Sequence, residues 1–475
     1  MTQRYISSIG GYLPLLRLQR MTALAALRWS GLGGLRDGCR TVAGWDEDAL
    51  TFATEASRDL LADPVDSLVF ASTSAFFTER AQSGLMVDAL ALPRTTRGQD
   101  VAGSRRCATS ALLAALEGSG SAVIAAGEKR PTQVGSAQQL TWGDGGAAVR
   151  IGPDGSARYL AGVSFSHDFI DIYASRDQPT PYAYEERFVR EFATADIIVP
   201  SIGAVLAKAG IAADRIAFAA VAEPLPNTWP AIARKLGISA PNLASELITQ
   251  VGDLGAAHPL FALGLAFVRA KPGDIVLLAG FGSGCDALLF EVRASVPGAA
   301  AMPAMVAQGQ MLADYVRFLN LAGSIDLAWG MRAEFEQKAQ ASVIARHGRD
   351  TMGFIGGRDS TGNAQFPKTP IPVNPALDAP EPLTDVRLAD EQARIVSITA
   401  DRLNFTPDPP FDFGLVQFDN GARVMMELTD RPAKGFAVGD PVSMRFRIKS
   451  QDSRRGFRTY FWKAAPITRP ELETA

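Results

Sequence analysis

The sequence has few of the residues that would build a disulfide framework or a metal site. Its 475 residues contain three cysteines, Cys39, Cys107 and Cys285, which are too few and too scattered for a set of bridges or for a four-cysteine zinc site. The three histidines also lack the spacing of metal ligands. We therefore expect no metal, and a reducing compartment, the cytoplasm, as the location of the protein.

An excess of charge and long apolar runs are missing as well. The 47 basic and 50 acidic residues leave a net charge of -3, so no basic field points to nucleic acid. No run of eighteen apolar residues is present, and residues 1–14 have no cationic segment followed by an apolar run, as a secretory signal would. We expect neither a nucleic acid nor a membrane as a partner.

Strand-like and helix-like segments alternate over roughly the first 300 residues. Residues 67–72 and 216–222 are short apolar runs rich in small and β-branched residues, as in buried strands. Residues 45–62 form an amphipathic helical pattern with acidic residues in its first turn, and residues 258–270 form a second helical pattern. This alternation predicts an α/β domain.

The last third of the chain has a different pattern. Residues 301–350 are predominantly helical in character, and residues 353–392 are rich in glycine and proline and weakly periodic, as in a linker or a small irregular module. Short β-rich runs follow, and Asn420 and Gly421 between two alternating runs are a strong hairpin signal. Four or five strands in about 75 residues predict a small barrel.

Several stretches carry a resemblance to known families. The segments AGWDEDALTFATEASRDLL, SHDFIDIYAS, TWGDGGAAVRI and GFGSGCDALLF, in this order, resemble hydroxymethylglutaryl-CoA synthases of the thiolase superfamily, especially the archaeal type. The segments GFIGGRDSTGNAQFPKTPIPVNP, ARIVSITA and GFRTYFWKAAP resemble OB-fold proteins with a rubredoxin-like zinc ribbon, which accompany thiolases and these synthases as acyl-CoA-binding partners. The resemblance implies a thiolase-like αβαβα domain fused to a C-terminal OB-fold barrel, with coenzyme A or acyl-CoA as the ligand.

The resemblance divides the chain into five parts. The ribbon of the second family carries two pairs of cysteines, the first ahead of a Q-F-P segment. This chain keeps Gln365, Phe366 and Pro367 but has no cysteine between 286 and 475, so we expect the zinc to be lost and packing or proline-rich turns to hold the module. The parts are the two halves of the thiolase-like domain (1–160 and 161–300), a helical connector (301–352), a degenerate ribbon or linker (353–392) and the OB-fold domain (393–475).

The resemblance also implies which residues should carry the chemistry. In the synthases a cysteine accepts the acyl group, a glutamate is the general acid/base, and a histidine and an asparagine polarise the thioester. In this chain Thr73 stands at the glutamate position and Ala222 at the histidine position, next to Glu223. Asp253 stands at the asparagine position, and His258 follows five residues later.

Cys107 allows two interpretations. An alignment of RRCATSAL through Thr109 puts Arg105 at the nucleophile position and Cys107 two residues later. Two residues are about 200° of rotation on a helix, so this thiol would face away from the original site, as a small core residue does. The alternative is that Cys107 is itself a nucleophile at a helix N-terminus.

The sequence allows more than one function for the two arginines that precede Cys107. Arg105 and Arg106 are candidates for binding a phosphate of coenzyme A or an acidic surface of a partner. Arg105 is alternatively expected to fill the former pocket by pairing with Asp253 or Glu223.

The glycine-rich segment GFGSG lies between two predicted strands, so it does not match a dinucleotide-binding loop, which needs a strand followed by a helix. The resemblance implies that Gly282, Ser283 and Gly284 form a wall of the acyl pocket, where the backbone must come close to the ligand. A tight hairpin without such a role explains the same residues.

Two functional hypotheses follow. In the first, the chain is a catalytically degenerate, acyl-CoA-binding subunit that pairs with a separate thiolase-type catalytic subunit, or with itself, in a complex that forms or cleaves carbon–carbon bonds in acyl-CoA thioesters. In the second, it is an autonomous acyl-CoA acyltransferase or condensing enzyme, with Cys107 as nucleophile and Glu223, Asp253 or His258 as acid/base groups.

Overall fold

The computed structural model describes most of the chain. It covers residues 3–31, 36–325, 327, 341–369, 371, 373–377, 379–404, 406–452 and 456–467. The chain forms two compact units: unit 1 is Met1–Ala43, Glu47–Val87 and Pro93–Ile325, and unit 2 is Gly44–Asp46, Asp88–Leu92 and Asp326–Ala475. The finer division into five parts stays a prediction.

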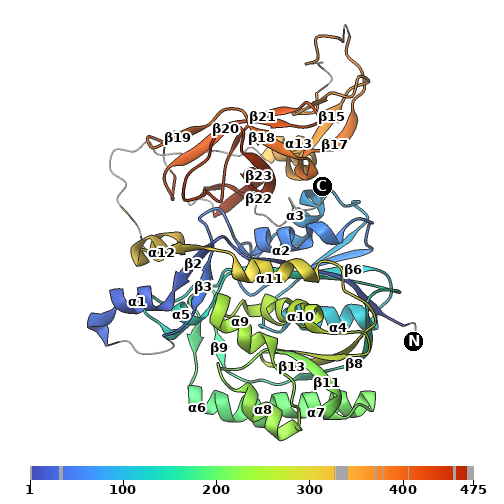
Figure 1. Cartoon of the computed structure of the whole chain (residues 1–475), viewed down its shortest axis with the longest axis vertical. Helices are drawn as coiled ribbons and strands as arrows, with labels where there is room; N and C mark the ends of the chain where they lie inside the picture. Colours follow the sequence, from blue (N-terminus) through green and yellow to red (C-terminus); the bar gives the residue numbers. More distant parts are fainter. Residues whose placement is uncertain are drawn as a thin grey trace. The chain divides into compact units, whose positions relative to one another are not determined.

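Unit 1 is built on a nine-stranded mixed sheet with the order β11-β12-β13-β8-β1-β7-β6-β4-β5 (Figure 1). Its strands β1 and β8 pair only at Tyr5–Arg158 and Ile6–Ala157, so the sheet consists of two groups, β5 to β1 and β8 to β11. The strands are β1 (Tyr5–Tyr12), β4 (Ser67–Ala71), β5 (Arg97–Val101), β6 (Ala122–Glu128), β7 (Gly145–Gly152), β8 (Ala157–Ser166), β11 (Ile216–Val221), β12 (Ile275–Phe281) and β13 (Gly284–Val292).

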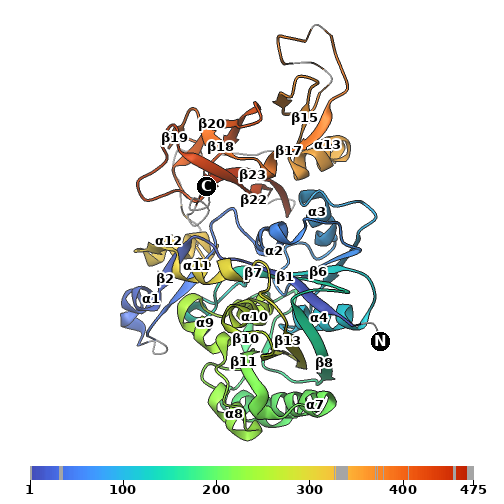
Figure 2. The same cartoon turned by 45° about the vertical axis from the view of Figure 1, so that its right-hand side comes forward.

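Helices cover and separate the two groups of strands. Helices α4 (Cys107–Glu117) and α10 (His258–Arg269) contact strands of both groups and lie between them (Figures 1 and 2). Helix α2 (Ala49–Ser57) packs on β1, β6 and β7, and α7 (Val199–Ala209) packs on β8 and β13. The layers therefore follow the predicted αβαβα order. Because α10 lies between the two groups of strands, it is buried on nearly all sides, unlike an amphipathic surface helix.

Local sequence explains why α2 begins where it does. The Asp48 carboxylate accepts a hydrogen bond from the Thr51 backbone N–H at 3.1 Å, and the Thr51 hydroxyl accepts one from the Asp48 N–H at 2.9 Å. This reciprocal capping box satisfies N–H groups that have no partner inside the helix. The acidic start of the predicted helix over residues 45–62 is therefore its N-cap.

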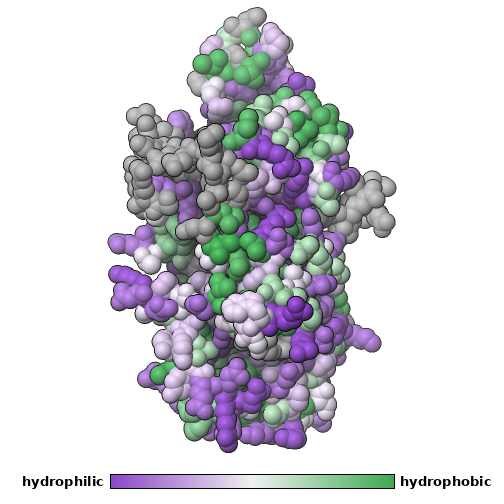
Figure 3. Space-filling model, turned by 90° about the vertical axis from the view of Figure 1, so that its left-hand side faces the viewer, coloured by the Kyte–Doolittle hydropathy of each residue, from purple (hydrophilic) through white to green (hydrophobic). Residues whose placement is uncertain are grey.

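One long helix crosses the second half of unit 1. It runs from α6 (Glu186–Phe188) through the π-helix η3 (Val189–Ile198) into α7, and among the described residues only this helix, Glu186–Ala209, is long and apolar enough to span a membrane. Its apolar side packs into a core through Ile197, Ile198 and Ile202. The lower end of the face in Figure 3, at the height of α6 to α8 in Figure 1, is mainly hydrophilic. Burial on one side and a polar exterior are the properties of a helix that packs on a protein core.

Unit 2 contains α13 (Ala341–Gly353) and two antiparallel sheets. A three-stranded sheet has the order β16-β15-β17, and a six-stranded sheet has the order β19-β20-β18-β22-β23 with β21 paired to β20. This second sheet is the predicted C-terminal OB-fold barrel, and the predicted Asn420–Gly421 turn joins β20 to β21, with Gly421 at φ 98°. The strands are β15 (Ile355–Arg358), β16 (Ala364–Gln365), β17 (Thr384–Arg387), β18 (Ala393–Ile395), β19 (Thr399–Asp401), β20 (Phe411–Phe418), β21 (Arg423–Glu427), β22 (Pro441–Asp452) and β23 (Phe457–Pro466).

The structure differs from the sequence-based expectation in the connecting region. Within the predicted helical segment 301–350, β14 (Gln310–Leu312) is a strand that pairs in parallel with β2 (Leu16–Gln19), and residues 328–340 lie outside the described part. The segment 353–392, expected to be irregular, contains β15, β16 and β17. These strands are only two to four residues long, and β15 has the sequence IGGR, so no alternating pattern marks them.

The cysteine-free ribbon is organised around one carboxylate. Asp359 Oδ1 accepts hydrogen bonds from the backbone N–H groups of Thr361 at 3.0 Å and Asn363 at 2.9 Å, and Asp359 Oδ2 accepts one from Asn374 Nδ2 at 3.0 Å. The carboxylate thus connects two turns of the module. In the described part of the chain, no group of three or more His, Cys, Asp and Glu side chains could hold a metal ion.

A buried ion cluster in unit 2 yields the first prediction. Lys463 Nζ lies 2.9 Å from Asp46 Oδ2 and 2.9 Å from Glu427 Oε2, and its side chain is 3% exposed. Lys463→Met removes the positive charge and leaves Asp46 buried without its ion pair, so we expect a loss of about 3–5 kcal/mol in the free energy of unfolding, measured by urea denaturation.

The control for this change is Arg269→Met. Arg269 pairs with Glu246 at 2.6 Å, but both side chains are well exposed, so its removal should change stability by less than about 1 kcal/mol. Equal effects of the two substitutions would contradict the importance of the buried cluster.

Candidate functional site

A cavity of about 310 Å³ in unit 1 is the candidate site. It lies where strands β11 and β12 end and helix α4 begins, since residues 223–227 follow β11, Phe281 ends β12 and Arg105 precedes α4. Further wall residues come from the segments 137–142, 171–190 and 248–258. The carboxyl ends of strands and a helix N-terminus thus meet at one cavity.

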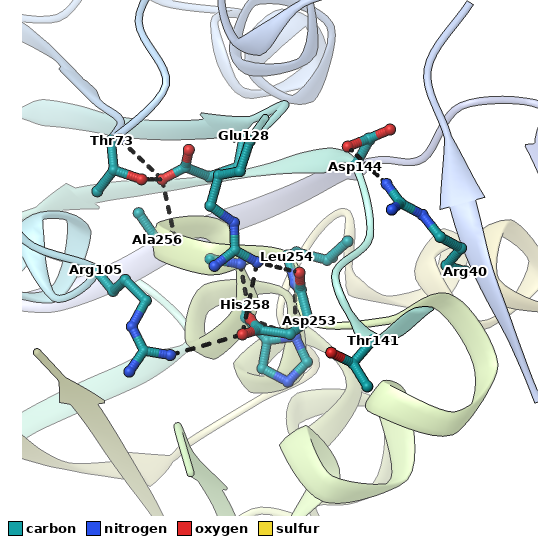
Figure 4. A network of polar contacts seen from close by, with 12 residues as sticks. Arg40, Thr73, Arg105, Glu128, Thr141, Asp144, Asp253, Leu254, Ala256 and His258 are labelled. Atoms are coloured by element: carbon teal, nitrogen blue, oxygen red, sulfur yellow. Dashed lines mark hydrogen bonds and ion pairs between the residues drawn. The ribbon is translucent and has the colours of Figure 1, made fainter. Parts of the chain in front are cut away.

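Arg105, at the position where the resemblance places the nucleophile, is held in the cavity by two carboxylates, of which Figure 4 shows Asp253. Its guanidinium forms an ion pair with Asp171, and its Nη1 lies 3.8 Å from Asp253 Oδ2. The predicted pairing with Asp253 is therefore present, whereas no ion pair joins Arg105 to Glu223 among the described contacts. Asp171 was missed, although it lies in the segment SHDFIDIYAS that carried part of the resemblance.

Asp253, at the position where the resemblance places the asparagine, is a fixed negative charge. Burial alone would raise the pKa of this carboxyl, but Arg130, whose Nη2 lies 3.5 Å away, and also Arg105 hold the pKa well below its usual range. The Gly255 backbone N–H also donates to Asp253 Oδ1 at 2.8 Å. A carboxylate stabilised in this way stays ionised at neutral pH and is a weak general base.

His258 is buried with both ring nitrogens in hydrogen bonds. Its Nδ1 accepts from the Leu254 N–H at 3.2 Å, and its Nε2 lies 3.0 Å from the Ala244 carbonyl oxygen, which assigns the proton to Nε2. Burial lowers the pKa of the imidazole, against the opposing charge of Asp253. The ring is therefore neutral and has no free nitrogen for proton transfer to a ligand.

Glu223 lines the cavity but serves the helix that follows. Its carboxylate accepts hydrogen bonds from the Trp229 N–H at 2.9 Å and the Thr228 hydroxyl at 3.1 Å, and from the Ser245 hydroxyl. These donors lie at the start of α8 (Trp229–Leu236) and on α9 (Leu243–Val251). The Glu223 carboxylate thus satisfies the N-terminus of α8.

A second carboxylate, Glu128, was not predicted. It ends β6 with 0% exposure, and its Oε1 accepts hydrogen bonds from the backbone N–H and the hydroxyl of Thr73, both at 2.9 Å (Figure 4). It also accepts from the Ser74 hydroxyl at 2.6 Å and the Ala256 N–H at 3.3 Å. A carboxylate from β6 therefore accepts hydrogen bonds from Thr73, at the position where the resemblance places the glutamate. The only local signal in the sequence was a charge at the end of an apolar run.

Cys107 and Ala222 do not line the cavity. Cys107, the first residue of α4, is 2% exposed and belongs to the main hydrophobic core of unit 1. Burial, and then the negative charge of Glu128, raise the pKa of its thiol. The Cys107 thiol is therefore protonated at neutral pH and is a poor nucleophile. Ala222 follows β11 and donates its N–H to the Ala279 carbonyl at 2.8 Å.

Arg106 contacts the glycine-rich segment and holds it next to the start of α4. Arg106 Nη1 lies 2.7 Å from Asp286 Oδ1, and its Nε donates to the Gly282 carbonyl at 3.0 Å. Gly282 (φ 152°), Ser283 (φ 48°) and Gly284 (φ 124°) form the tight turn between β12 and β13. None of these residues lines the cavity. Their proposed roles in binding coenzyme A stay predictions.

Comparison with known proteins agrees with this description of the two units. The fold of unit 1 is thiolase-like. The model for the ChsH2 C-terminal OB-fold domain matches residues 385–447. A hydroxymethylglutaryl-CoA synthase from Aeropyrum pernix is 26% identical over 294 residues, which cover 58% of this chain and 80% of the synthase.

Solved structures extend the likeness to three dimensions. A hydroxymethylglutaryl-CoA synthase complexed with coenzyme A matches with a TM-score of 0.58 at 15% identity, over 71% of this chain and 95% of that chain. A second structure, in complex with 3-hydroxy-3-methylglutaryl coenzyme A, has a TM-score of 0.55 at 18% identity and covers 68% and 92%. The N-terminal part thus has synthase homologues and a thiolase-like fold, and the predicted resemblance is confirmed.

The burial of Cys107 predicts slow alkylation. We expect iodoacetamide at pH 8 to leave Cys107 unmodified in the folded protein and to modify it in urea, since only unfolding exposes the thiol and restores an ordinary pKa. Peptide mass spectrometry after a short exposure measures the modification site by site. Rapid modification of Cys107 in the folded chain would contradict the assignment of this residue to the core.

Proposed function

We propose that the chain is an acyl-CoA-binding, catalytically degenerate subunit of a thiolase-type complex that forms or cleaves carbon–carbon bonds in acyl-CoA thioesters. The observation that carries the proposal is the ion pairing of Arg105, the residue that the resemblance aligns with the nucleophile, with Asp171 and Asp253. A guanidinium cannot form an acyl-enzyme, so the covalent step would fall to another subunit.

The neighbouring groups support the same conclusion. A condensing enzyme needs a thiolate, a group that transfers protons and donors that stabilise an oxyanion. Here Cys107 lies in the core, Glu223 holds the start of α8, and the imidazole of His258 has both nitrogens engaged. The alternative of an autonomous acyltransferase that uses Cys107 is therefore not favoured.

Binding of an acyl-CoA thioester is supported by the cavity and by the relatives. The cavity of about 310 Å³ has apolar walls that include Leu140, Ile248 and Phe281, which suit an acyl chain. The structural relatives were solved with coenzyme A and with 3-hydroxy-3-methylglutaryl coenzyme A. We propose that the C-terminal OB-fold domain contributes to holding the same ligand, and that the protein acts in the cytoplasm.

An open sheet edge is consistent with a partner subunit. Strand β5 is the last strand of the nine-stranded sheet, and within the described residues it pairs with β4 alone; its residues Arg97–Asp100 are exposed. Such an edge offers unpaired backbone groups to a strand of another chain. We propose a separate thiolase-type catalytic subunit as the partner, with a homodimer as the alternative.

Purification from the native host tests the proposal. We expect the chain to co-purify with a thiolase-type subunit and, alone, to bind acetyl-CoA in calorimetry without forming an acyl-enzyme or turning over acyl-CoA. The physical reason is that the cavity retains its walls but lacks a free nucleophile. Turnover by the isolated chain, or an acyl group on Cys107 that disappears in Cys107→Ser, would overturn the proposal.

A cysteine introduced at position 105 tests whether a side chain at this position is accessible from the cavity. In the variant Arg105→Cys, Cys107→Ser, we expect the new thiol to react with iodoacetamide because position 105 lines the cavity. Arg105→Met is the matched control for the lost ion pair and should destabilise the fold to a similar degree, since both variants leave Asp171 buried without its partner. A thiol at position 105 as unreactive as Cys107 would contradict the placement.

A further inference from the structure

The Arg105 guanidinium has hydrogen-bonding capacity that its two carboxylates do not use. Its side chain lines the cavity and is 14% exposed. Among the described contacts, its one side-chain hydrogen bond runs from Nη2 to Asp171. Nη1 lies 3.8 Å from Asp253 Oδ2, which is close enough for an ion pair but too far for a hydrogen bond. Because a guanidinium carries five N–H donors, Nη1 can donate to a further acceptor.

The separation between Arg105 and Asp253 is fixed by the backbone. The two side chains face one another from different segments of the chain (Figure 4). The Asp253 N–H donates to the Thr141 carbonyl at 2.8 Å, and its own carbonyl accepts from the Gly143 N–H at 2.9 Å. Its Oδ1 also accepts from the Gly255 N–H at 2.8 Å. Asp253 therefore has little freedom to move toward Nη1, and we expect the missing acceptor to come from a ligand.

Three other polar side chains of the wall do not offer a donor. The carboxylate of Glu223 accepts hydrogen bonds, as described above. The Thr141 hydroxyl and the Nε2 of His258 already donate to backbone carbonyls, at 2.9 Å and 3.0 Å. A carbonyl oxygen that leaves water for this cavity needs a new donor, since a buried acceptor without one is costly. Arg105 can supply it.

The charges around Arg105 favour an acceptor without a charge. The guanidinium forms ion pairs with Asp171 and Asp253, and Arg130 also pairs with Asp253, so two positive and two negative charges are balanced. A phosphate group next to Arg105 would bring further negative charge close to both carboxylates, whereas a carbonyl oxygen would not. The contacts therefore favour a carbonyl over a phosphate of coenzyme A as the acceptor for this residue.

We propose, on the basis of the acyl-CoA-binding function proposed above, that Arg105 Nη1 donates a hydrogen bond to the thioester carbonyl oxygen of a short-chain acyl-CoA. A cavity of about 310 Å³ has room for a short acyl group together with its thioester. The donor is charged, so the bond is stronger than one between neutral groups. Arg105 thus distinguishes an acyl thioester from a ligand that lacks the carbonyl oxygen.

Two ligands of equal length provide the test. S-ethyl coenzyme A is the thioether in which a CH₂ group replaces the carbonyl of acetyl-CoA, so the two ligands differ in one acceptor. We expect calorimetry on the full-length chain to give a dissociation constant for acetyl-CoA that is smaller by about tenfold or more. Equal or tighter binding of S-ethyl coenzyme A overturns the inference.

A conservative substitution tests the donor. Arg105→Lys keeps a positive charge for Asp171 but loses the second nitrogen of the planar guanidinium, so we expect the preference for acetyl-CoA to fall below about threefold. Arg40→Lys is the matched control, because Arg40 is also buried, its Nη2 lies 3.3 Å from Asp144 Oδ1, and it does not line the cavity. The control should keep the preference of the wild type.

Infrared spectroscopy observes the carbonyl directly. With acetyl-CoA that carries ¹³C at the carbonyl, we expect the C=O band of the bound ligand to lie at a lower frequency than that of the free ligand, because a charged donor weakens this bond more than water does. In Arg105→Lys the band should return toward the position of the free ligand. An unshifted band in the wild type would contradict the hydrogen bond.

The outcomes separate this inference from the proposed function. If the wild type binds neither coenzyme A nor acetyl-CoA, the proposed function fails and the inference fails with it. If both bind but S-ethyl coenzyme A binds as well as acetyl-CoA, only the role of Arg105 is overturned. If Arg105→Lys does not fold, as circular dichroism would reveal, the two ligands and the infrared band of the wild type decide.

Discussion

The charge of Arg105 determines the state of the groups around it. A guanidinium on the wall of a cavity needs nearby carboxylates, and Asp171 and Asp253 supply them from two different segments of the chain. Asp253 in turn faces Arg130, and Arg130 holds the ring of Trp142. Each of these charged groups therefore has a group of opposite charge nearby, and Arg130 also lies against the ring of Trp142.

The residues at the four positions where the resemblance would place the chemistry, or next to them, each have separate local contacts. Thr73 binds the carboxylate of Glu128, which comes from another strand, and Asp253 binds two arginines. Cys107 packs in the core between the two groups of strands, and Ala222 continues a strand backbone. None of these side chains offers a free acid, base or nucleophile, and each contributes to the packing or hydrogen bonding of unit 1.

The sequence predicted those features that depend on local pattern. Alternating strand and helix segments and the family motifs gave the thiolase-like layers, and Asn420 and Gly421 gave the β20–β21 hairpin. The short strands of the ribbon were missed because two to four residues carry no period. Asp171 and Glu128 were missed for another reason: their partners Arg105 and Thr73 are 66 and 55 residues away, and only the fold brings them together.

The charged groups of the cavity wall depend on one another. A buried charge needs a partner of opposite charge, since an isolated one is costly to keep away from water. Arg105 is paired with Asp171 and Asp253, and Arg130 lies between Asp253 and the ring of Trp142. An apolar side chain in place of Arg105 would leave Asp171 buried without its partner, so the ion pairs that hold the wall together also keep a polar group at the cavity.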